Sequence, residues 1–169
     1  MATTRISKSE LKKHIKLDES VIEKINMFGA PVESVTEEEI ELEIMPNRPD
    51  LLSAEGFTRA FKAFMGKEVG LKKYKVHSPD KDFKVKISSS VNEIRPYTAC
   101  AIVKKLKLDD KKIRNLIDMQ EKLHNTIGRN RKKAAIGIYP LEKITLPITY
   151  EARKPQDIKF IPLESEKEI

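Results

Sequence analysis

Apolar positions in the first part of the chain recur with two periods, which predict helices and one strand. Apolar residues at helical spacing follow Asp18, so we expect a helix that Asp18 caps and that ends at Gly29. Residues 7–10, with serine first and glutamate fourth, have the capping-box pattern and predict a short helix before it. Residues 40–44 alternate between aliphatic and acidic side chains, which is the period of a half-buried strand.

A turn with two prolines ends this strand. Residues 46–49 read Pro-Asn-Arg-Pro, and Asp50 is expected to cap a following helix that ends at Gly66. Residues 67–82 are mainly polar and contain a proline and two aspartates, so they predict a linker or a long loop.

The remainder of the chain shows the same mixture of periods. Its patterns predict strands at 83–87, 97–108, 134–139, 144–151 and 158–161, and a helix that Asp109 or Asp110 caps and Gly128 closes. Cys100 is expected to be a small buried thiol within one of these strands. The fold class is therefore α+β, in two small mixed units at 1–80 and 83–169.

Charge is distributed unevenly between these halves. The chain carries a net charge of +7; residues 1–80 hold 13 basic and 14 acidic side chains, whereas residues 81–169 hold 20 and 12. Within 104–133 there are 11 basic and 4 acidic side chains. A neutral first half and a basic second half predict that any contact with a polyanion lies in the second half.

Several classes of protein do not fit the composition. No apolar run approaches the roughly 20 residues of a membrane-spanning helix, and the N-terminal residues lack the apolar segment of a secretory signal. The single cysteine fits a reducing compartment. One cysteine and three scattered histidines make no metal-ligand spacing, so no metal site is expected. We expect a cytoplasmic protein without membrane contact.

The best candidate for nucleic-acid contact is the run at 129–133, where Arg129, Arg131, Lys132 and Lys133 follow a predicted helix. Each contact between these side chains and a phosphate would release counterions, which gives a salt-dependent and sequence-independent attraction. The alternative is a solvated helix end whose positive charges interact with the helix dipole.

Two other groups of residues invite a functional interpretation, but a structural one is favoured. His124 falls toward the apolar face of its helix, so a buried and hydrogen-bonded histidine is favoured over a general base. Asn47, Arg48 and Asp50 are interpreted as a tight turn, in which Arg48 bridges to a carboxylate, or else as a contact with a partner. No catalytic residue is assigned.

Four stretches taken together resemble the beta subunit of phenylalanyl-tRNA synthetase, in its archaeal and eukaryotic branch. They are NRPDL with SAEG at 47–51 and 53–56; IRPY at 94–97; QEKLH, IGR and AIGI at 120–124, 127–129 and 135–138; and DIKFIPL at 157–163. Their order and spacing carry the resemblance, which covers almost the whole chain.

The resemblance implies an alpha subunit as partner, which carries the aminoacylation site, in an assembly of two alpha and two beta subunits that acts on tRNA(Phe). ATP and magnesium are implied for the whole enzyme, with no cofactor bound by this chain. Residues 1–80 would be the family's first small domain. Residues 83–169 would open a larger mixed-sheet editing domain, which hydrolyses tyrosine wrongly attached to tRNA(Phe).

Most residues around the family's hydrolytic pocket lie further along the chain than position 169. The chain alone is therefore expected to be inactive, with an incomplete second domain that shows an open sheet edge and exposed apolar surface. Two alternatives stay open: a free-standing hydrolase of misacylated tRNA, and a non-enzymatic RNA-binding module that uses residues 104–133.

Overall fold

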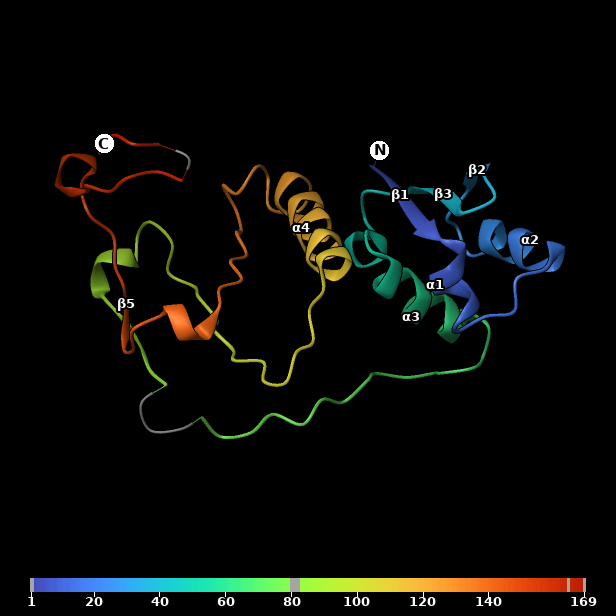
Figure 1. The fold of residues 1–169 in the computed structure, drawn as a ribbon, viewed down its shortest axis with the longest axis horizontal. Coiled ribbons are helices and arrows are strands. Elements are labelled where there is room, and N and C mark those ends of the chain that lie inside the picture. Colours follow the sequence, from blue (N-terminus) through green and yellow to red (C-terminus); the bar gives the residue numbers. More distant parts are fainter. Residues whose placement is uncertain (1, 80–82, 164, 169) are drawn as a thin grey trace. The chain divides into compact units, whose positions relative to one another are not determined.

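The computed structural model describes residues 2–79, 83–163 and 165–168, and it has the expected mixture of helices and strands (Figure 1). The chain divides into two compact units, each formed from two segments. The first unit comprises Met1–Lys73 and Lys107–Gly137, and the second comprises Tyr74–Leu106 and Ile138–Ile169. Within the described residues, no helix combines the length and the apolar character that crossing a membrane requires.

This division differs from the expected split into 1–80 and 83–169, because residues 107–137 lie with the first unit. Their helix, α4 (Asp110–Asn125), contributes Leu123 to the packing around the first unit's core. Near the start of the same helix, Lys111 Nζ lies 3.7 Å from a carboxylate oxygen of Glu10. Such packing between distant segments leaves no mark on local periodicity.

A three-stranded antiparallel sheet forms one side of the first unit. Its order is β1 (Ala2–Ser7), β3 (Glu39–Ile44) and β2 (Val32–Val35), so β3 is central. Ile6 of β1 pairs with Ile40 of β3, which places aliphatic side chains of both strands on the same face. The prediction of a strand at 40–44 is confirmed, whereas β1 and β2 were not predicted.

Three helices complete the first segment of this unit: α1 (Lys8–Lys12), α2 (Glu19–Met27) and α3 (Ala54–Phe64). The predicted cap of α2 is confirmed, because the Asp18 side chain accepts a hydrogen bond from Val21 N at 3.2 Å. The cap predicted for α3 is wrong.

Ser53, not Asp50, caps α3, and its hydroxyl accepts a hydrogen bond from Gly56 N at 3.0 Å. Asp50 lies one turn earlier, in a 3-10 helix at Pro49–Leu51, and its carboxylate is held by Arg48. Both residue types are good N-caps, but the carboxylate of Asp50 is engaged by Arg48.

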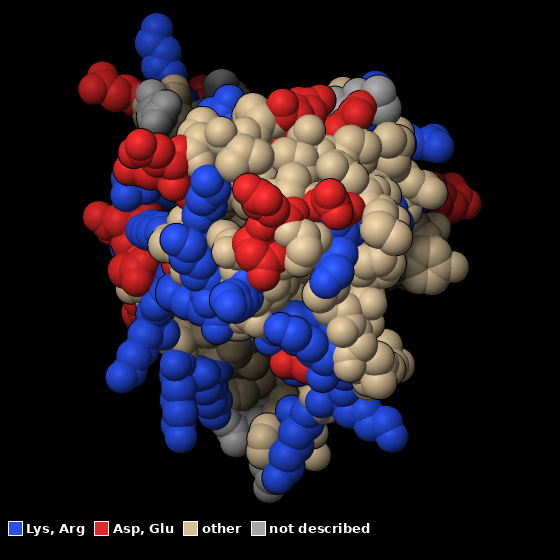
Figure 2. Space-filling model, turned by 90° about the vertical axis from the view of Figure 1, so that its right-hand side faces the viewer, with Lys and Arg blue, Asp and Glu red and all other residues tan. Residues whose placement is uncertain are grey.

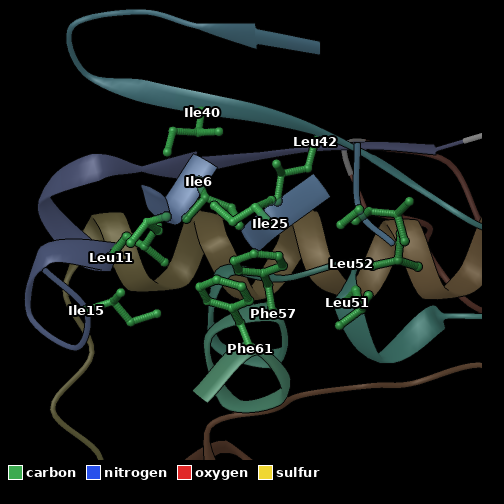
Figure 3. Close-up of a cluster of buried hydrophobic side chains, with 13 residues drawn as sticks. Ile6, Leu11, Ile15, Ile25, Ile40, Leu42, Leu51, Leu52, Phe57 and Phe61 are labelled. Carbon is green, nitrogen blue, oxygen red and sulfur yellow. The ribbon is translucent and has the colours of Figure 1, made fainter. Parts of the chain in front are cut away.

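The core of the first unit lies between the sheet and α3 (Figure 3). Phe57 and Phe61, four residues apart on α3, are fully buried with their rings stacked 5.4 Å apart. Phe28, just after α2, packs edge-on against both rings. Other large aliphatic side chains that are fully buried come from β1, β3, α1, α2 and the turn before α3: Ile6, Leu11, Ile25, Ile40, Leu42, Ile44 and Leu51.

The second unit contains little regular structure. Two short parallel strands, β4 (Val85–Ile87) and β5 (Ile148–Tyr150), form its sheet. They confirm the C-terminal parts of the strands predicted at 83–87 and 144–151. Short 3-10 helices occur at Ser89–Val91, Leu141–Lys143 and Pro155–Asp157.

The strands predicted at 97–108 and 158–161 do not form in the described chain, and many of their apolar side chains are exposed. Alternating apolar and polar residues form a strand only where a neighbouring strand pairs with their backbone groups. Lys105 also has a positive φ of 63°, which interrupts an extended backbone. Cys100, expected to be buried in this strand, is exposed. Exposed apolar surface in this part of the chain was expected, and it is present.

Candidate nucleic-acid interface

The candidate site is built on α4, which presents one face to the core of the first unit. The Asp109 side chain accepts a hydrogen bond from Lys112 N at 2.9 Å, which confirms the predicted cap. Near the other end of the helix, His124 is buried and Leu123 is partly buried, whereas Ile113 and Ile117 are exposed. The C-terminal end of the helix is therefore packed against the first unit, and the loop that follows it lies at the surface.

The loop after α4 folds back and satisfies the last carbonyl groups of the helix. The amide of Thr126 donates to the carbonyl of Lys122 at 3.0 Å, and the amide of Gly128 donates to that of Leu123 at 2.9 Å. A Cβ atom at Gly128 would lie 2.7 Å from the carbonyl oxygen of Ala134, so the close backbone approach requires glycine. The helix was predicted to close at this glycine, but α4 ends three residues earlier, at Asn125.

Three consecutive residues in this loop have left-handed backbone conformations. Their φ angles are 49° at Arg129, 54° at Asn130 and 64° at Arg131. This conformation costs roughly 1–2 kcal/mol for each residue with a Cβ, so other contacts must hold it in place. Two such contacts are the hydrogen bonds from Arg131 N to the carbonyl of His124 at 3.2 Å and from Lys133 N to the carbonyl of Gly128 at 2.9 Å.

We call residues 129–133 the basic loop, because its backbone brings all four predicted basic side chains into one exposed turn. The guanidinium of Arg131 is paired with the carboxylate of Glu121 on α4. Arg129 and Lys133 make no ion pair with any residue that the structure describes. The loop therefore keeps an excess of positive charge that an anion could neutralise.

Glu121 lies between the basic loop and the buried histidine. Hydrogen bonding from Arg131 is the main cause that holds the pKa of the Glu121 carboxyl below its ordinary value. The same carboxylate oxygen lies 3.4 Å from Nδ1 of His124. Sequence reasoning missed Glu121, because its partner in the basic loop is ten residues away along the chain.

His124 has the structural role that the sequence favoured. Its side chain is buried, and its Nε2 atom accepts a hydrogen bond from Ile136 N at 2.8 Å. Gln120, one turn earlier, donates from Nε2 to the carbonyl of Ile136 at 2.8 Å. The strand predicted at 134–139 does not form. Instead, the amide and the carbonyl of Ile136 are both hydrogen-bonded to side chains of α4.

The turn that contains Asn47, Arg48 and Asp50 lies elsewhere in the first unit. Arg48 donates two hydrogen bonds of 2.9 Å to the two carboxylate oxygens of Asp50, and its guanidinium lies 5.3 Å from the ring centroid of Phe28. The hydrogen bonds from Arg48 lower the pKa of the Asp50 carboxyl, and they raise the pKa of Arg48 itself. The predicted bridge to a carboxylate is confirmed, and Asn47 is exposed.

The division into units changes where the positive charge belongs. The first unit carries 21 basic and 17 acidic side chains, a surplus of four, and the second carries 12 and 9, a surplus of three. On the face shown in Figure 2, basic side chains gather in the lower part and acidic ones lie among and above them. The basic run at 104–133 thus contributes mainly to the first unit.

Comparisons with known proteins place the chain in a family. No protein-family model matches it. It is 42% identical to the phenylalanine–tRNA ligase beta subunit of Methanocaldococcus jannaschii over 100% of this chain and 31% of that protein. It is 40% identical to the same subunit of Methanosphaera stadtmanae over 89% of this chain and 27% of that protein.

A solved structure gives the same result. An N-terminal fragment of the phenylalanyl-tRNA synthetase beta subunit from Pyrococcus horikoshii is 34% identical, with a TM-score of 0.84, over 99% of this chain and 50% of that one. The chain spans about a third of the length of the curated relatives that it matches. It therefore belongs to the family of phenylalanine–tRNA ligase beta subunits and corresponds to their N-terminal part.

Proposed function

We propose that this chain is the N-terminal region of a cytoplasmic beta subunit that works with an alpha subunit to attach phenylalanine to tRNA(Phe). The observation that carries the proposal is the match to the beta subunit of Methanocaldococcus jannaschii, at 42% identity over the whole chain. The proposal assigns the aminoacylation site, ATP and magnesium to the whole enzyme, in an assembly of two alpha and two beta subunits.

Co-expression tests this assignment. The complete gene that contains this chain, expressed with the alpha-subunit gene of the same genome, should give a complex that charges tRNA(Phe) with phenylalanine. Preparations from which either gene is omitted serve as controls and should be inactive. A stable complex without charging activity, or two subunits that do not associate, would contradict the proposal.

We further propose that the basic loop contacts the phosphate backbone of tRNA. The contact is supported by the exposed turn that gathers Arg129, Arg131, Lys132 and Lys133 and by the ordered backbone that holds it. Arginine and lysine contacts to phosphate position a nucleic acid without reading its sequence. Selection of tRNA(Phe) would therefore depend on other parts of the enzyme.

The salt dependence of binding measures this contact. Alanine at all four basic positions should lower the slope of log affinity against log salt by up to about 3.5, at roughly 0.9 for each phosphate neutralised. The matched control removes four lysines from a nine-residue stretch of the same unit, at Lys8, Lys12, Lys13 and Lys16. Equal slopes for the two fourfold variants would show that the basic loop is a solvated helix end.

A role in editing completes the proposal. A pocket shaped for phenylalanine discriminates only about a hundredfold against a side chain that adds a hydroxyl group, so misattached tyrosine must be removed by hydrolysis. We propose that the chain supplies scaffold for this hydrolysis. The 169 residues alone should not release tyrosine from Tyr-tRNA(Phe) above background, and clear turnover in a deacylation assay would favour a free-standing hydrolase.

A further inference from the structure

We propose that the carboxylate of Glu121 competes with phosphate for the guanidinium of Arg131. When the basic loop binds a phosphate, Arg131 leaves Glu121 and pairs with the ligand. The inference rests on the proposed contact between the basic loop and tRNA. It adds a control element to that contact, because one charge of the loop is neutralised until the ligand arrives.

The positions of the two partners make such an exchange feasible. The side chains of Arg131 and Glu121 are 49% and 42% exposed, so a phosphate can reach the guanidinium while the pair is still formed. An ion pair at this exposure adds little to stability, and its loss is easily offset. A guanidinium also binds carboxylate and phosphate oxygens with the same two-pronged geometry.

The loop backbone has supports other than the pair. Arg131 N is bonded to the carbonyl of His124, and Lys133 N is bonded to the carbonyl of Gly128. Both bonds use main-chain atoms, so the left-handed turn can persist when the arginine side chain turns away. The exchange therefore moves only the side chain of Arg131, and the loop backbone that carries it is already formed.

Glu121 also keeps a partner after the exchange. Its Oε1 atom lies 3.4 Å from Nδ1 of His124, whose Nε2 accepts the amide hydrogen of Ile136. Because Nε2 is an acceptor, the imidazole proton is on Nδ1 and faces the carboxylate. The carboxylate released by Arg131 thus remains beside a hydrogen-bond donor.

The test compares Glu121→Gln with Asp118→Asn. Both variants remove one negative charge from α4, but Asp118 pairs with Lys122 at 2.8 Å and not with the basic loop. Affinity for a tRNA(Phe) transcript is measured by fluorescence anisotropy at one salt concentration. We expect E121Q to bind about twofold to fivefold more tightly than D118N, from the range of exposed ion-pair energies.

A double-mutant cycle separates this effect from general electrostatics. In a background of Arg131→Ala, the gain from E121Q should fall to that of D118N, because the competing pair no longer exists. An E121Q variant that binds no better than D118N would overturn the inference, as would an equal gain in the R131A background. If the fourfold alanine variant binds like the wild type, both the proposed contact and this inference fail.

A second measurement keeps the test independent of the folding of E121Q. In the wild-type chain, the Nε–H resonance of Arg131 is followed by NMR during titration with the tRNA(Phe) transcript. The inference predicts a shift that saturates together with binding. Binding that leaves this resonance unchanged would show that Arg131 stays with Glu121, and it would overturn the inference.

Discussion

The imidazole of His124 on α4 holds the backbone of Ile136, whose amide donates to Nε2 of the histidine at 2.8 Å. The carbonyl of Ile136 accepts a hydrogen bond from Gln120 on the same helix. Side chains of a helix thus take the place that a neighbouring strand would fill. This arrangement fixes the segment that leaves the basic loop and keeps residues up to Gly137 with the first unit.

Replacing His124 with alanine should destabilise the first unit by about 1–3 kcal/mol, because the amide of Ile136 loses its acceptor in a partly buried setting. Urea unfolding measures the change. His14→Ala is the matched control, since His14 is exposed and the same atoms are removed. Equal stability of the two variants would show that the hydrogen bond contributes nothing.

Replacing Gly56 with alanine should also destabilise the first unit, although alanine is intrinsically the better helix former. A Cβ atom at position 56 would lie 2.0 Å from the carbonyl oxygen of Asp50, so the turn before α3 must shift. Overpacking of this kind costs about 1–3 kcal/mol. Thermal unfolding is compared with Glu55→Ala at the neighbouring exposed position, and a Gly56→Ala variant as stable as wild type would contradict the expected clash.

Replacing Asp50 with asparagine should lower stability at neutral pH and have less effect in acid. The hydrogen bonds from Arg48 lower the pKa of the Asp50 carboxyl in the folded state, so its contribution is present above the ordinary aspartate pKa. That contribution is lost as the pH falls through the lowered pKa of the folded protein. The difference from wild type should therefore shrink as the pH falls below about 4.

Unfolding in urea at a series of pH values between neutral and acid checks this expectation. Glu37→Gln, in the exposed turn between β2 and β3, removes a carboxylate elsewhere in the same unit and serves as the control. A difference between wild type and Asp50→Asn that stays constant across the series would mean that the pair with Arg48 does not couple to folding.

Limited proteolysis should reveal where the chain passes between the units. It does so after Lys73, Leu106 and Gly137. A nonspecific protease should cut first within 67–79, which is exposed and has neither helix nor strand, and next around 104–107. After these cuts, the fragment that carries α4 should co-elute with the N-terminal fragment in size-exclusion chromatography, with both identified by mass spectrometry. First cuts inside α4 would contradict this grouping.

Local signals in the sequence predicted much of the first unit. Asp18 and Asp109 cap their helices as expected, and the alternation at 40–44 forms β3. Each of these features depends on residues that are close together in the sequence, so it forms whatever the rest of the chain packs against. The family resemblance is of the same kind, because it rests on short motifs in a fixed order.

Other features were decided only by tertiary structure. The sequence of β1, ATTRIS, has little apolar alternation, and it is a strand because β3 pairs with it across more than thirty residues of intervening chain. The segment at 134–139 has a strand pattern but no strand partner, since His124 and Gln120 hold it instead.

The basic loop combines both kinds of information. Its four positive charges and the glycine before them were evident from the sequence alone. The pairing of Arg131 with Glu121 and the place of α4 in the first unit were not. Periodicity and capping act within a helical turn, whereas strand pairing, ion pairs and helix packing depend on which distant segments meet, and the folded chain alone decides that.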